Sequence, residues 1–375
     1  MKKKIYNYDF LIVGAGLIGS LAALALHKKK FKVLAVDKEA KRSQDKRTLA
    51  VNANSKDFLT QIGIWNNLKS KPQPINKIII KDYVNSNPLI FENKKESMGN
   101  VVFNQEVLSE AKKVCQKKKI LISNFSLDYK NIPKNNILNI KNKTYHFKKI
   151  ILSVGKNINL NLISNRQQIK YRNQQYAYVG FFSHSKIHRN IAYEIFTKTG
   201  PLAVLPSPQK NNLKSTFIYS SKQKITNLDI KSLIKKNFYN SHGDITFDKS
   251  INKYPIIIKL NKDKSNFILL GDALKSIHPV AGQGWNLGVK DIQTLCNLAD
   301  QLSLEGNLLN QIYFARRFAE SAAYLIFTSS LNFLYENFNP FTKSVIKLGY
   351  QGLNNFSSIK NIFIKQAMGR INLVD

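Results

Sequence analysis

The sequence has little cysteine. Cys115 and Cys296 are its two cysteines in 375 residues. They give no disulfide framework and no metal-ligand spacing, so we expect two free thiols in a reducing cytoplasm. The six histidines show no ligand spacing either, and we therefore predict no metal site.

Acidic residues are also scarce. The chain has 23 Asp and Glu against 58 Lys and Arg, a formal net charge of +35. Such an excess is typical of nucleic-acid binding, of attraction to an anionic membrane, or of a proteome rich in Lys, Asn and Ile. The lysines are spread in short runs along the chain, without an arginine-rich tract or a helix-turn-helix pattern. We therefore predict no nucleic-acid partner and favour a compositional origin, with a membrane surface as the alternative.

Long hydrophobic runs are absent, with one exception. Residues 10–26 form an uncharged apolar stretch after an initial lysine run, as in a signal peptide or membrane anchor. Asp9 interrupts its approach, three glycines divide it, and three lysines at 28–30 end it without a small-residue cleavage site. We interpret it as a buried strand and helix. The hydrophobic content of 43% predicts a globular chain with one large α/β domain or two subdomains.

The glycines of that stretch belong to the most specific motif. An apolar strand leads into Gly14-Ala15-Gly16, Gly19 follows, a helical run continues to Lys30, and a second strand ends on Asp37. This βαβ context is typical of the dinucleotide fingerprint, whose glycines allow a tight turn, close approach of a pyrophosphate and close helix packing. We predict a pyrophosphate at the helix N-terminus and a ribose diol on Asp37. The alternative is a glycine-rich turn that binds nothing.

A second glycine motif lies near the other end of the chain. An apolar strand at 268–270 ends in Gly271-Asp272, and His278-Pro279 leads through Gly282-Gln283-Gly284 into a helical run. An aspartate after a parallel strand points into the ligand crevice, where it can accept from ribityl hydroxyls. Glycines before a helix present N–H groups to an anion or a ring carbonyl. The alternative is a turn with a helix cap.

The order of expected elements changes along the chain from βαβ to strand-rich and back. We expect further helices at 50–59, 106–118, 229–240, 285–302 and from 312 onward. We expect further strands within 75–92, with a turn at 85–88, and at 120–122, 137–140, 145–152, 171–182, 191–196, 202–205, 215–220 and 267–270. The four strands between 171 and 220 follow one another without a helix and predict an antiparallel sheet. The fold class is therefore α/β with two interleaved subdomains.

Together the motifs resemble the FAD-dependent aromatic hydroxylases of the p-hydroxybenzoate hydroxylase class and, within it, the ubiquinone-biosynthesis hydroxylases. The resemblance covers essentially the whole chain. Beside the two glycine motifs it rests on Arg47–Val51, Phe58–Trp65, Met98–Leu108, Gly200–Pro206 and Gln366–Gly369. It implies a discontinuous, GR2-type Rossmann-like FAD-binding domain with an interleaved antiparallel β-sheet substrate domain and C-terminal helices. The boundaries we expect are 1–75, 98–160 and 260–325 for the first, 76–97 and 165–259 for the second, and 326–375 for the third.

The resemblance also implies a reaction. In this class NADH or NADPH reduces FAD, and the reduced flavin reacts with O2 to a C4a-hydroperoxide that hydroxylates an aromatic ring, while the protein positions the ring and excludes water. The narrower group implies a polyprenylated phenol in ubiquinone biosynthesis as substrate. It further implies a cytoplasmic protein, and leaves open contact with the inner face of the cytoplasmic membrane and with a quinone-biosynthesis complex.

Particular residues receive roles from the resemblance. The implied cofactor-binding residues are Gly14, Ala15, Gly16, Gly19, Asp37, Lys38, Arg47, Gln105, Gly271, Asp272, Gly284, Asn286 and Leu287. The implied catalytic loop is His278, Pro279, Gly282, Gln283 and Gly284. The implied substrate residues are Gly200, Pro201 and Leu202. For these three a packing role is the alternative, for Arg47 a surface cation, and for His278 a role in shaping the loop.

The chain departs from the class pattern in two places. Ser153-Val154-Gly155 stands where the class usually carries an Asp-Gly pair, and residues 103–106 lack the usual acidic-Asn-Arg order. The mode of flavin reduction is therefore in doubt. Two alternatives stay open: a non-catalytic or degenerate subunit of a quinone-biosynthesis complex, and a hydroxylase of the same fold that acts on another small aromatic.

The last expectation concerns the C-terminus. Aromatic and aliphatic residues recur at near-helical spacing between Tyr324 and Ile364, mixed with lysines. One interpretation is helices packed on the flavin domain or on a partner. The other is docking on a membrane that stores a polyprenyl substrate.

Overall fold

The computed structural model describes residues 5–38, 47–125, 127, 136–140, 143–156, 167–209, 211–262, 267–337 and 339–371. Its helices are α1 (Leu17–Lys28), α2 (Ala53–Gln61), α3 (Asn104–Lys117), α4 (Asn227–His242), α5 (Gly284–Gln301), α6 (Leu308–Glu336), α7 (Pro340–Asn355) and α8 (Ser357–Ala367). Short 3-10 turns are η1 (Trp65–Asn67), η4 (Gly271–Ala273) and η5 (Val280–Gly282).

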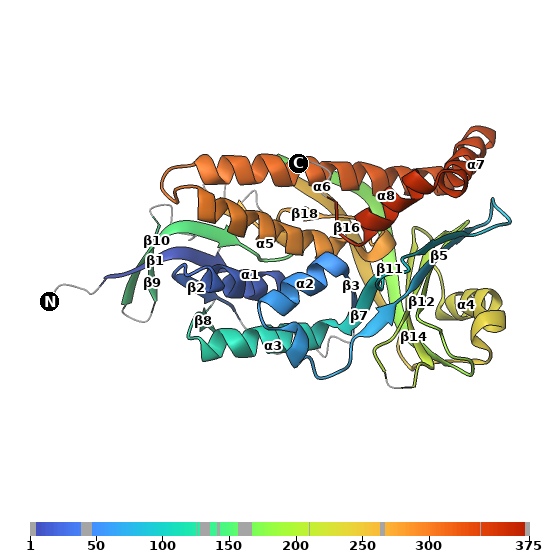
Figure 1. Cartoon of the computed structure of the whole chain (residues 1–375), viewed down its shortest axis with the longest axis horizontal. Coiled ribbons are helices and arrows are strands. Elements are labelled where there is room, and N and C mark those ends of the chain that lie inside the picture. Colours follow the sequence, from blue (N-terminus) through green and yellow to red (C-terminus); the bar gives the residue numbers. More distant parts are fainter. Residues whose placement is uncertain are drawn as a thin grey trace.

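A largely parallel sheet forms the half of the molecule that contains the N-terminus (Figure 1). Its order is β17 (Phe267–Leu269), β10 (Lys143–Leu152), β1 (Ile5–Val13), β2 (Val33–Val36) and β8 (Leu121–Ile122), with β9 (Ile137–Ile140) antiparallel to β10. Alternate residues of β1 enter two cores. Phe10 and Ile12 pack with α1, α3 and α5, while Leu11 and Val13 pack on the opposite face. A strand buried on both faces has a continuous apolar sequence, which is why residues 10–13 resemble a membrane segment.

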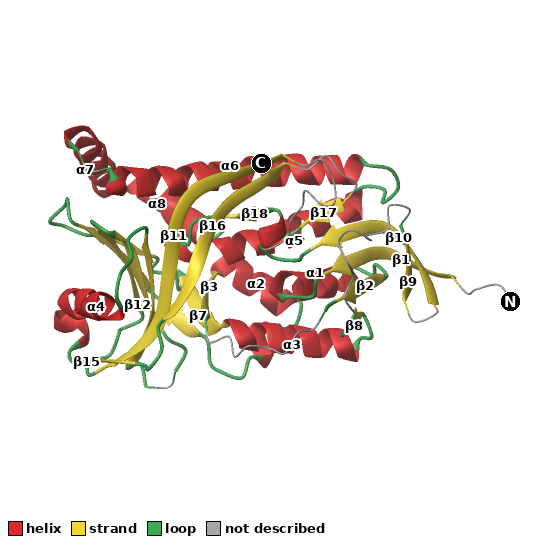
Figure 2. Cartoon of the chain, turned by 180° about the vertical axis from the view of Figure 1, so that it is seen from behind, coloured by secondary structure: helices red, strands yellow, loops and turns green. Residues whose placement is uncertain are grey.

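A second sheet stands at the other end (Figure 2). Its order is β18 (Lys275–Ser276), β16 (Asn252–Lys262), β11 (Gln167–His184), β14 (Lys214–Ser221), β13 (Gly200–Pro206), β12 (Ile191–Thr197), β5 (Lys77–Asp82) and β6 (Leu89–Glu92), and β15 (Ile245–Phe247) pairs with β11. Helix α4 packs on its outer face. A small sheet of β3 (Thr48–Asn52), β7 (Gly99–Phe103) and β4 (Gln73–Ile75) lies between the two.

The predicted α/β class with an interleaved second sheet is confirmed, and two local expectations are wrong. The helix expected from residue 50 begins at Ala53, because Ala50 and Val51 pair with β7 and Asn52 caps α2 by accepting from Ser55 N–H at 2.9 Å. The second sheet is not wholly antiparallel, since β5 joins β12 in parallel. The domain boundaries stay a proposal, and the one after residue 259 falls inside β16.

His184 and His188, four residues apart, meet the distant His242 under α4. The ring centre of His184 lies 4.6 Å from that of His242 and 5.9 Å from that of His188. All three are buried, and Nε2 of His188 and of His242 has no hydrogen-bond partner in the described structure. No group of three or more His, Cys, Asp or Glu among the described residues is placed to hold a metal ion.

Burial keeps these imidazoles neutral. It lowers the pKa of His188 to about 4 and that of His242 to about 3, and it also lowers the pKa of His184. The Lys186 carbonyl, which contacts His184, raises the pKa of that imidazole and offsets the effect of burial only in part. The other contacts are hydroxyl groups, from Ser215 to His184 and from Ser241 to His242. The folded chain therefore resists protonation at pH values where free histidine binds a proton.

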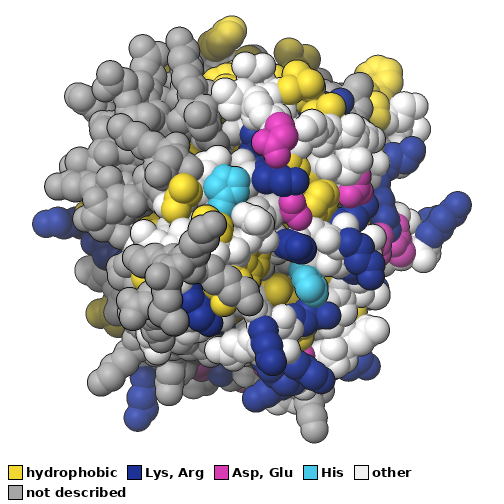
Figure 3. Space-filling view, turned by 90° about the vertical axis from the view of Figure 1, so that its left-hand side faces the viewer, with side chains coloured by type: hydrophobic (Ala, Val, Ile, Leu, Met, Phe, Trp, Pro, Cys, Tyr) yellow, Lys and Arg dark blue, Asp and Glu magenta, His cyan; other side chains and the backbone are white. Residues whose placement is uncertain are grey.

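The basic residues visible on the N-terminal end of the molecule lie scattered over its described part rather than over one element (Figure 3). Among the described residues, no helix is long and apolar enough to cross a membrane.

We predict that acid destabilises the fold through this histidine cluster. Unfolded histidines bind protons below about pH 6.5 while the folded ones stay neutral, so stability falls as the pH drops from 6.5 towards 4, by up to about 1.4 kcal/mol per pH unit for each histidine. The check is the urea midpoint between pH 7 and pH 5. His242→Leu should flatten this dependence, whereas His146→Gln, at an exposed position, should not. Equal slopes in all three proteins would contradict the prediction.

Candidate active site

The fingerprint loop joins β1 to α1, and its glycines differ in what they allow. Gly14 has a φ of +93°, and a Cβ there would lie 2.6 Å from the Ser153 carbonyl oxygen. A Cβ on Gly19 would lie 1.9 Å from the Gly14 carbonyl oxygen. At Gly16 no atom lies within 4 Å of the Cβ position. The fold therefore requires glycine at 14 and 19, whereas Gly16 leaves open space beside the backbone.

Helix α1 begins next to this open space without a capping side chain. Gly16 is its N-cap, and no acidic residue lies in its first turn. The first N–H groups of a helix have no acceptor within the helix and carry partial positive charge. Open space beside uncapped N–H groups fits a pyrophosphate.

Asp37 follows β2, and an ion pair holds it. Its carboxylate lies 2.6 Å from Nζ of Lys112 on α3, and the side chains are 17% and 7% exposed. The sequence interpretation missed Lys112, although a lysine on the otherwise apolar buried face of α3 was a signal. Lys38, the next residue after Asp37, is exposed.

The two glycine motifs meet at one side chain. A Cβ on Gly271 would lie 3.1 Å from Cγ1 of Ile18, and a Cβ on Gly288 would lie 2.7 Å from its Cδ1. Ile18 belongs to the first turn of α1, Gly271 to η4 and Gly288 to α5. The fingerprint and the second motif therefore form one continuous site.

The second motif brings another uncapped helix start to this site. Asp272 follows β17 in η4 and is half-buried. Gly282 ends η5 with a φ of +60°, and α5 begins at Gly284 without a side-chain cap. The peptide N–H groups after Gln283 are therefore placed like those of α1, at the predicted catalytic loop.

The Asn286 and Leu287 side chains have supporting roles. Asn286 donates to the Ala50 carbonyl at 2.9 Å and accepts from the Asn52 N–H at 3.1 Å. Leu287 is buried against Ile277. The Asn286 amide thus connects α5 to β3. Its side chain is therefore already hydrogen-bonded within the protein at the position where we predict a cofactor contact.

His278 is fully buried and uses both ring nitrogens. Its Nδ1 accepts from the Val280 N–H at 3.3 Å, and its Nε2 lies 2.8 Å from Oε1 of Gln175. The Gln175 amide nitrogen lies 2.7 Å from Glu336 of α6. Burial lowers the pKa of His278 to about 4. This geometry supports the loop-shaping interpretation, because a neutral imidazole clamps the start of the Pro279 loop to β11.

The remaining residues predicted to bind the cofactor differ in how deeply they are buried. Ala15 is buried in the fingerprint loop. Arg47 is exposed, with its guanidinium carbon 5.4 Å from the ring centre of Tyr254 on β16. Gln105 is half-buried in the first turn of α3. Their contacts with a cofactor stay predictions.

The substrate prediction needs a correction at Leu202. Leu202 is fully buried in the cluster beneath α4, so it points away from η5, and a Cβ on Gly200 would lie 1.9 Å from the Ser220 carbonyl oxygen. Packing thus accounts for Leu202 and Gly200. Because successive side chains of a strand point to opposite faces, Pro201 lies on the face opposite to Leu202. The sequence interpretation missed Glu194, a buried acid opposite Ala203 on that face.

Val154 takes the place where the class carries an aspartate. It follows β10, and its partly buried side chain packs on the core that contains Leu11 and Val13. The neighbouring Ser153 approaches Gly14, as described above. An apolar side chain at this position leaves the sheet edge without the carboxylate expected of the class.

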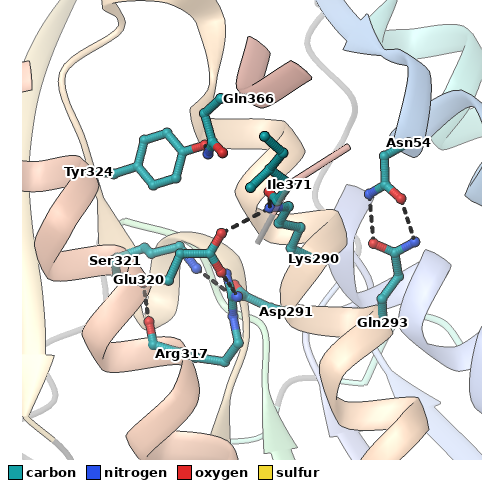
Figure 4. Close-up of polar contacts among 11 residues, drawn as sticks. Asn54, Lys290, Asp291, Gln293, Arg317, Glu320, Ser321, Tyr324, Gln366 and Ile371 are labelled. Carbon is teal, nitrogen blue, oxygen red and sulfur yellow. Dashed lines mark hydrogen bonds and ion pairs between the residues drawn. The ribbon is translucent and has the colours of Figure 1, made fainter. Parts of the chain in front are cut away.

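A buried cluster of charges contacts the second motif through Gly271 and Lys275, and Figure 4 shows Lys290, Asp291, Arg317 and Glu320 of this cluster. Its members are Lys275, Lys290, Asp291, Arg317 and Glu320. Asp291 pairs with Lys275 and lies 2.7 Å from Nε of Arg317, and its second oxygen accepts from the Gly271 N–H at 3.0 Å. The carboxylate therefore fixes the turn that presents Asp272.

The cluster also reaches the C-terminal segment. Nζ of Lys290 lies 3.0 Å from Glu320 and 3.1 Å from the Ile371 carbonyl oxygen, and Gln366 contacts Tyr324 of α6 (Figure 4). Arg370 pairs with Asp57 of α2. Residues 366–371 thus contact both α5 and α2 and connect these two helices beside the site.

The FAD binding domain family matches residues 7–123 and 252–313. These two segments are therefore similar to an FAD binding domain. The matched residues include both glycine motifs, and the open space at Gly16 with the two uncapped helix N-termini fits this cofactor.

Curated relatives resemble the chain over nearly its whole length. Ubiquinone hydroxylase UbiL of Rhodospirillum rubrum is 24% identical, over 97% of this chain and 90% of its own. Ubiquinone biosynthesis monooxygenase COQ6 of Caenorhabditis elegans is 22% identical, over 95% of each chain. The resemblance to the ubiquinone-biosynthesis hydroxylases is therefore confirmed.

Solved structures share the fold. The p-nitrophenol 4-monooxygenase PnpA from Pseudomonas putida superposes with a TM-score of 0.74 at 14% identity, over 97% of this chain and 98% of its own. The flavin-dependent brominase Bmp2 gives a TM-score of 0.72 at 11% identity, over 98% and 94%.

We predict that Gly16→Ala loses FAD and keeps the fold. The added methyl group meets no protein atom but fills the space beside the α1 N–H groups, so FAD affinity should fall by roughly tenfold or more. Fluorescence titration of apoprotein measures it. Gly349→Ala, which also meets no atom, is the control and should bind FAD normally. Equal affinity in both variants would contradict a ligand at Gly16.

We also predict that Asp291→Asn is strongly destabilising. It leaves Lys275 and Arg317 buried without their carboxylate, a loss of roughly 3–5 kcal/mol in the free energy of unfolding. The surface pair Lys29–Asp300 provides the control, since Lys29→Met should cost less than about 1 kcal/mol. Urea denaturation of both apoproteins gives the comparison, and a similar cost for the two variants would refute the structural role of Asp291.

Proposed function

We propose that the chain is an FAD-dependent monooxygenase that uses NADH or NADPH and O2 to hydroxylate the aromatic ring of a polyprenylated phenol in ubiquinone biosynthesis. The observation that carries the proposal is the junction at Ile18, where Gly271 and Gly288 meet the fingerprint helix. The two relatives described above, which are named for ubiquinone hydroxylation and ubiquinone biosynthesis, match over 90% and 95% of their own length, which supports this substrate class.

Bound FAD supplies the redox chemistry and the activation of oxygen. The chain's own groups bind and orient it. The α1 N–H groups hold the pyrophosphate, Asp37 the ribose and Asp272 the ribityl chain. The N–H groups at Gly284 would be available to the ring system, because a helix N-terminus can stabilise developing negative charge.

The loop before α5 is held rigid by apolar packing and by His278. Val280 packs in the core that contains Phe196 and Tyr335, whose rings stack with centres 4.1 Å apart. This apolar surround excludes water from the ring-binding side. His278 remains neutral, so it holds the loop without adding a charge beside the flavin.

One observation favours an alternative function. Val154 stands where the class carries an aspartate, which suits a non-catalytic subunit of a quinone-biosynthesis complex. Our proposal also includes membership of such a complex and a location on the inner face of the cytoplasmic membrane.

The decisive test is turnover by the purified protein. We expect a yellow protein whose NAD(P)H oxidation is stimulated by a polyprenylated phenol, with a product one oxygen atom heavier by mass spectrometry. The Gly16→Ala variant, which we predict to bind FAD more weakly, is the matched control and should oxidise NAD(P)H more slowly at limiting FAD.

Deletion of the encoding gene provides an independent measurement. It should cause a quinone precursor lacking one ring hydroxyl to accumulate, and the precursor's structure identifies the ring position. FAD binding without phenol-stimulated NAD(P)H oxidation would instead support the subunit alternative, and stimulation by small phenols alone would favour another aromatic substrate.

A further inference from the structure

A chain of hydrogen bonds leads from the surface to the loop before α5. Nζ of Lys222, which follows β14, pairs with Oε2 of Glu336, the last residue of α6. Oε1 of Glu336 accepts from the Gln175 amide at 2.7 Å, and Oε1 of Gln175 lies 2.8 Å from Nε2 of His278. Nδ1 of His278 then accepts from the Val280 N–H at 3.3 Å. Three side chains thus connect an exposed lysine to the backbone of the predicted catalytic loop.

The chemistry of its two ends gives this chain of hydrogen bonds a direction. A carboxylate only accepts hydrogen bonds, so Gln175 must turn its NH2 group to Glu336 and its carbonyl oxygen to His278. Nε2 of His278 must therefore carry a hydrogen. A backbone N–H only donates, so the Nδ1 that faces Val280 must carry none. Both ends require the same neutral tautomer of His278, with its hydrogen on Nε2.

The other tautomer would break the chain of hydrogen bonds on both sides of the ring. A hydrogen on Nδ1 would face the Val280 N–H, and a bare Nε2 would face the Gln175 carbonyl oxygen. His278 is fully buried, and a buried polar group without its hydrogen bond costs free energy. The tautomer of His278 therefore determines whether the start of the loop is held.

The carboxylate of Glu336 is held in place from both sides. The hydroxyl of its neighbour Tyr335 donates to Oδ2 of Asp82 at 2.7 Å, and the Tyr335 carbonyl oxygen accepts from the Tyr83 hydroxyl at 2.7 Å. These bonds fix the last turn of α6 to the end of β5. Lys222 takes the second carboxylate oxygen. The direction of the amide next to Glu336 is therefore determined by two other strands of the sheet.

We propose that Gln175 and Glu336 are positioning residues that hold His278 in the tautomer with its hydrogen on Nε2. In this form Nδ1 accepts from the Val280 N–H and fixes the start of the loop before α5. The proposal rests on the proposed function only for its consequence, namely that a fixed loop presents the N–H groups at Gly284 to FAD. Neither positioning residue needs to touch the cofactor.

An ordinary surface ion pair is the alternative explanation for Lys222 and Glu336. Their side chains are 41% and 23% exposed, and an exposed pair contributes little to stability. The two explanations differ in one respect. An ion pair works with its charges in either order, whereas the chain of hydrogen bonds works in one direction only. Exchanging the two charges therefore separates the explanations.

The first measurement is the tautomer of His278 in the purified full chain, by nitrogen NMR of the imidazole rings at neutral pH. The His278 signals are identified by their loss in His278→Gln. We expect the hydrogen on Nε2 in the native chain and also in Glu336→Gln, whose amide oxygen can still accept from Gln175. A hydrogen on Nδ1 in the native chain would overturn the proposal without any further variant.

The decisive variant is the charge exchange Lys222→Glu/Glu336→Lys. It keeps an ion pair at the surface, but the introduced ammonium group only donates. The Gln175 amide must then turn over and face His278 with its NH2 group. We expect the hydrogen to leave Nε2 in a measurable fraction of the molecules. FAD affinity in a fluorescence titration should fall roughly threefold or more, because the loop loses a hydrogen bond at its start.

The pair Lys214–Asp248 provides a matched control. Lys214 begins β14, the two groups lie 2.9 Å apart, and their side chains are 20% and 41% exposed. Lys214→Asp/Asp248→Lys should keep the native tautomer and FAD affinity. If the exchange at positions 222 and 336 also keeps both, the proposal is wrong and Glu336 forms only a surface pair. The tautomer is measured without turnover or phenol, so a failure of the proposed reaction stays distinguishable.

Discussion

One buried carboxylate, that of Asp291, determines where three separate segments of the flavin site lie. It accepts from the Gly271 N–H after β17, pairs with Lys275 on β18 and pairs with Arg317 on α6. A buried ionised carboxylate is tolerable only with such partners. The turn that presents Asp272 therefore depends on a residue that need not touch the cofactor. Its neighbour Lys290 extends the same network to the C-terminal backbone, so the end of the chain supports a site begun by its first strand.

Close packing completes what this charge network begins. Ile18 fills the space left by the missing Cβ atoms of Gly271 and Gly288, which brings the N-termini of α1 and α5 to one place. The Asn286 amide then holds β3 against α5. Two helix ends without capping side chains are unfavourable in isolation, because their N–H groups lack acceptors. Packing holds them together for a ligand that supplies the acceptors.

The sequence could predict the parts of the site whose function depends on the backbone. Glycines at 14, 19 and 271 have conformational or steric requirements within the chain, and Gly16 leaves room for a ligand, so together they form a readable pattern. Side-chain partnerships across the fold leave no such pattern. The Asp37–Lys112 pair joins residues far apart in the sequence, and the histidine cluster joins His242 to the distant His184 and His188. The face on which Leu202 lies depends on strand register. The α2 boundary was missed because residues 50 and 51 are held by strand pairing with β7, which local propensity does not report.

The distribution of charge refines the interpretation of the excess of lysine. Asp291, Glu320 and Glu194 are buried. Part of the small number of acidic residues therefore lies inside the molecule, where it stabilises the fold, and not at the surface. Six basic residues are buried as well, namely Lys112, Lys149, Lys259, Lys275, Lys290 and Arg317, so burial does not make the described surface more basic than the composition indicates. A compositional bias explains why lysine is abundant, but it does not explain why residues 337–371 lack acid altogether beside exposed Phe341 and Leu348. The composition explains the number of lysines, whereas the sequence of α7 and α8 places several of them in a segment without acidic residues.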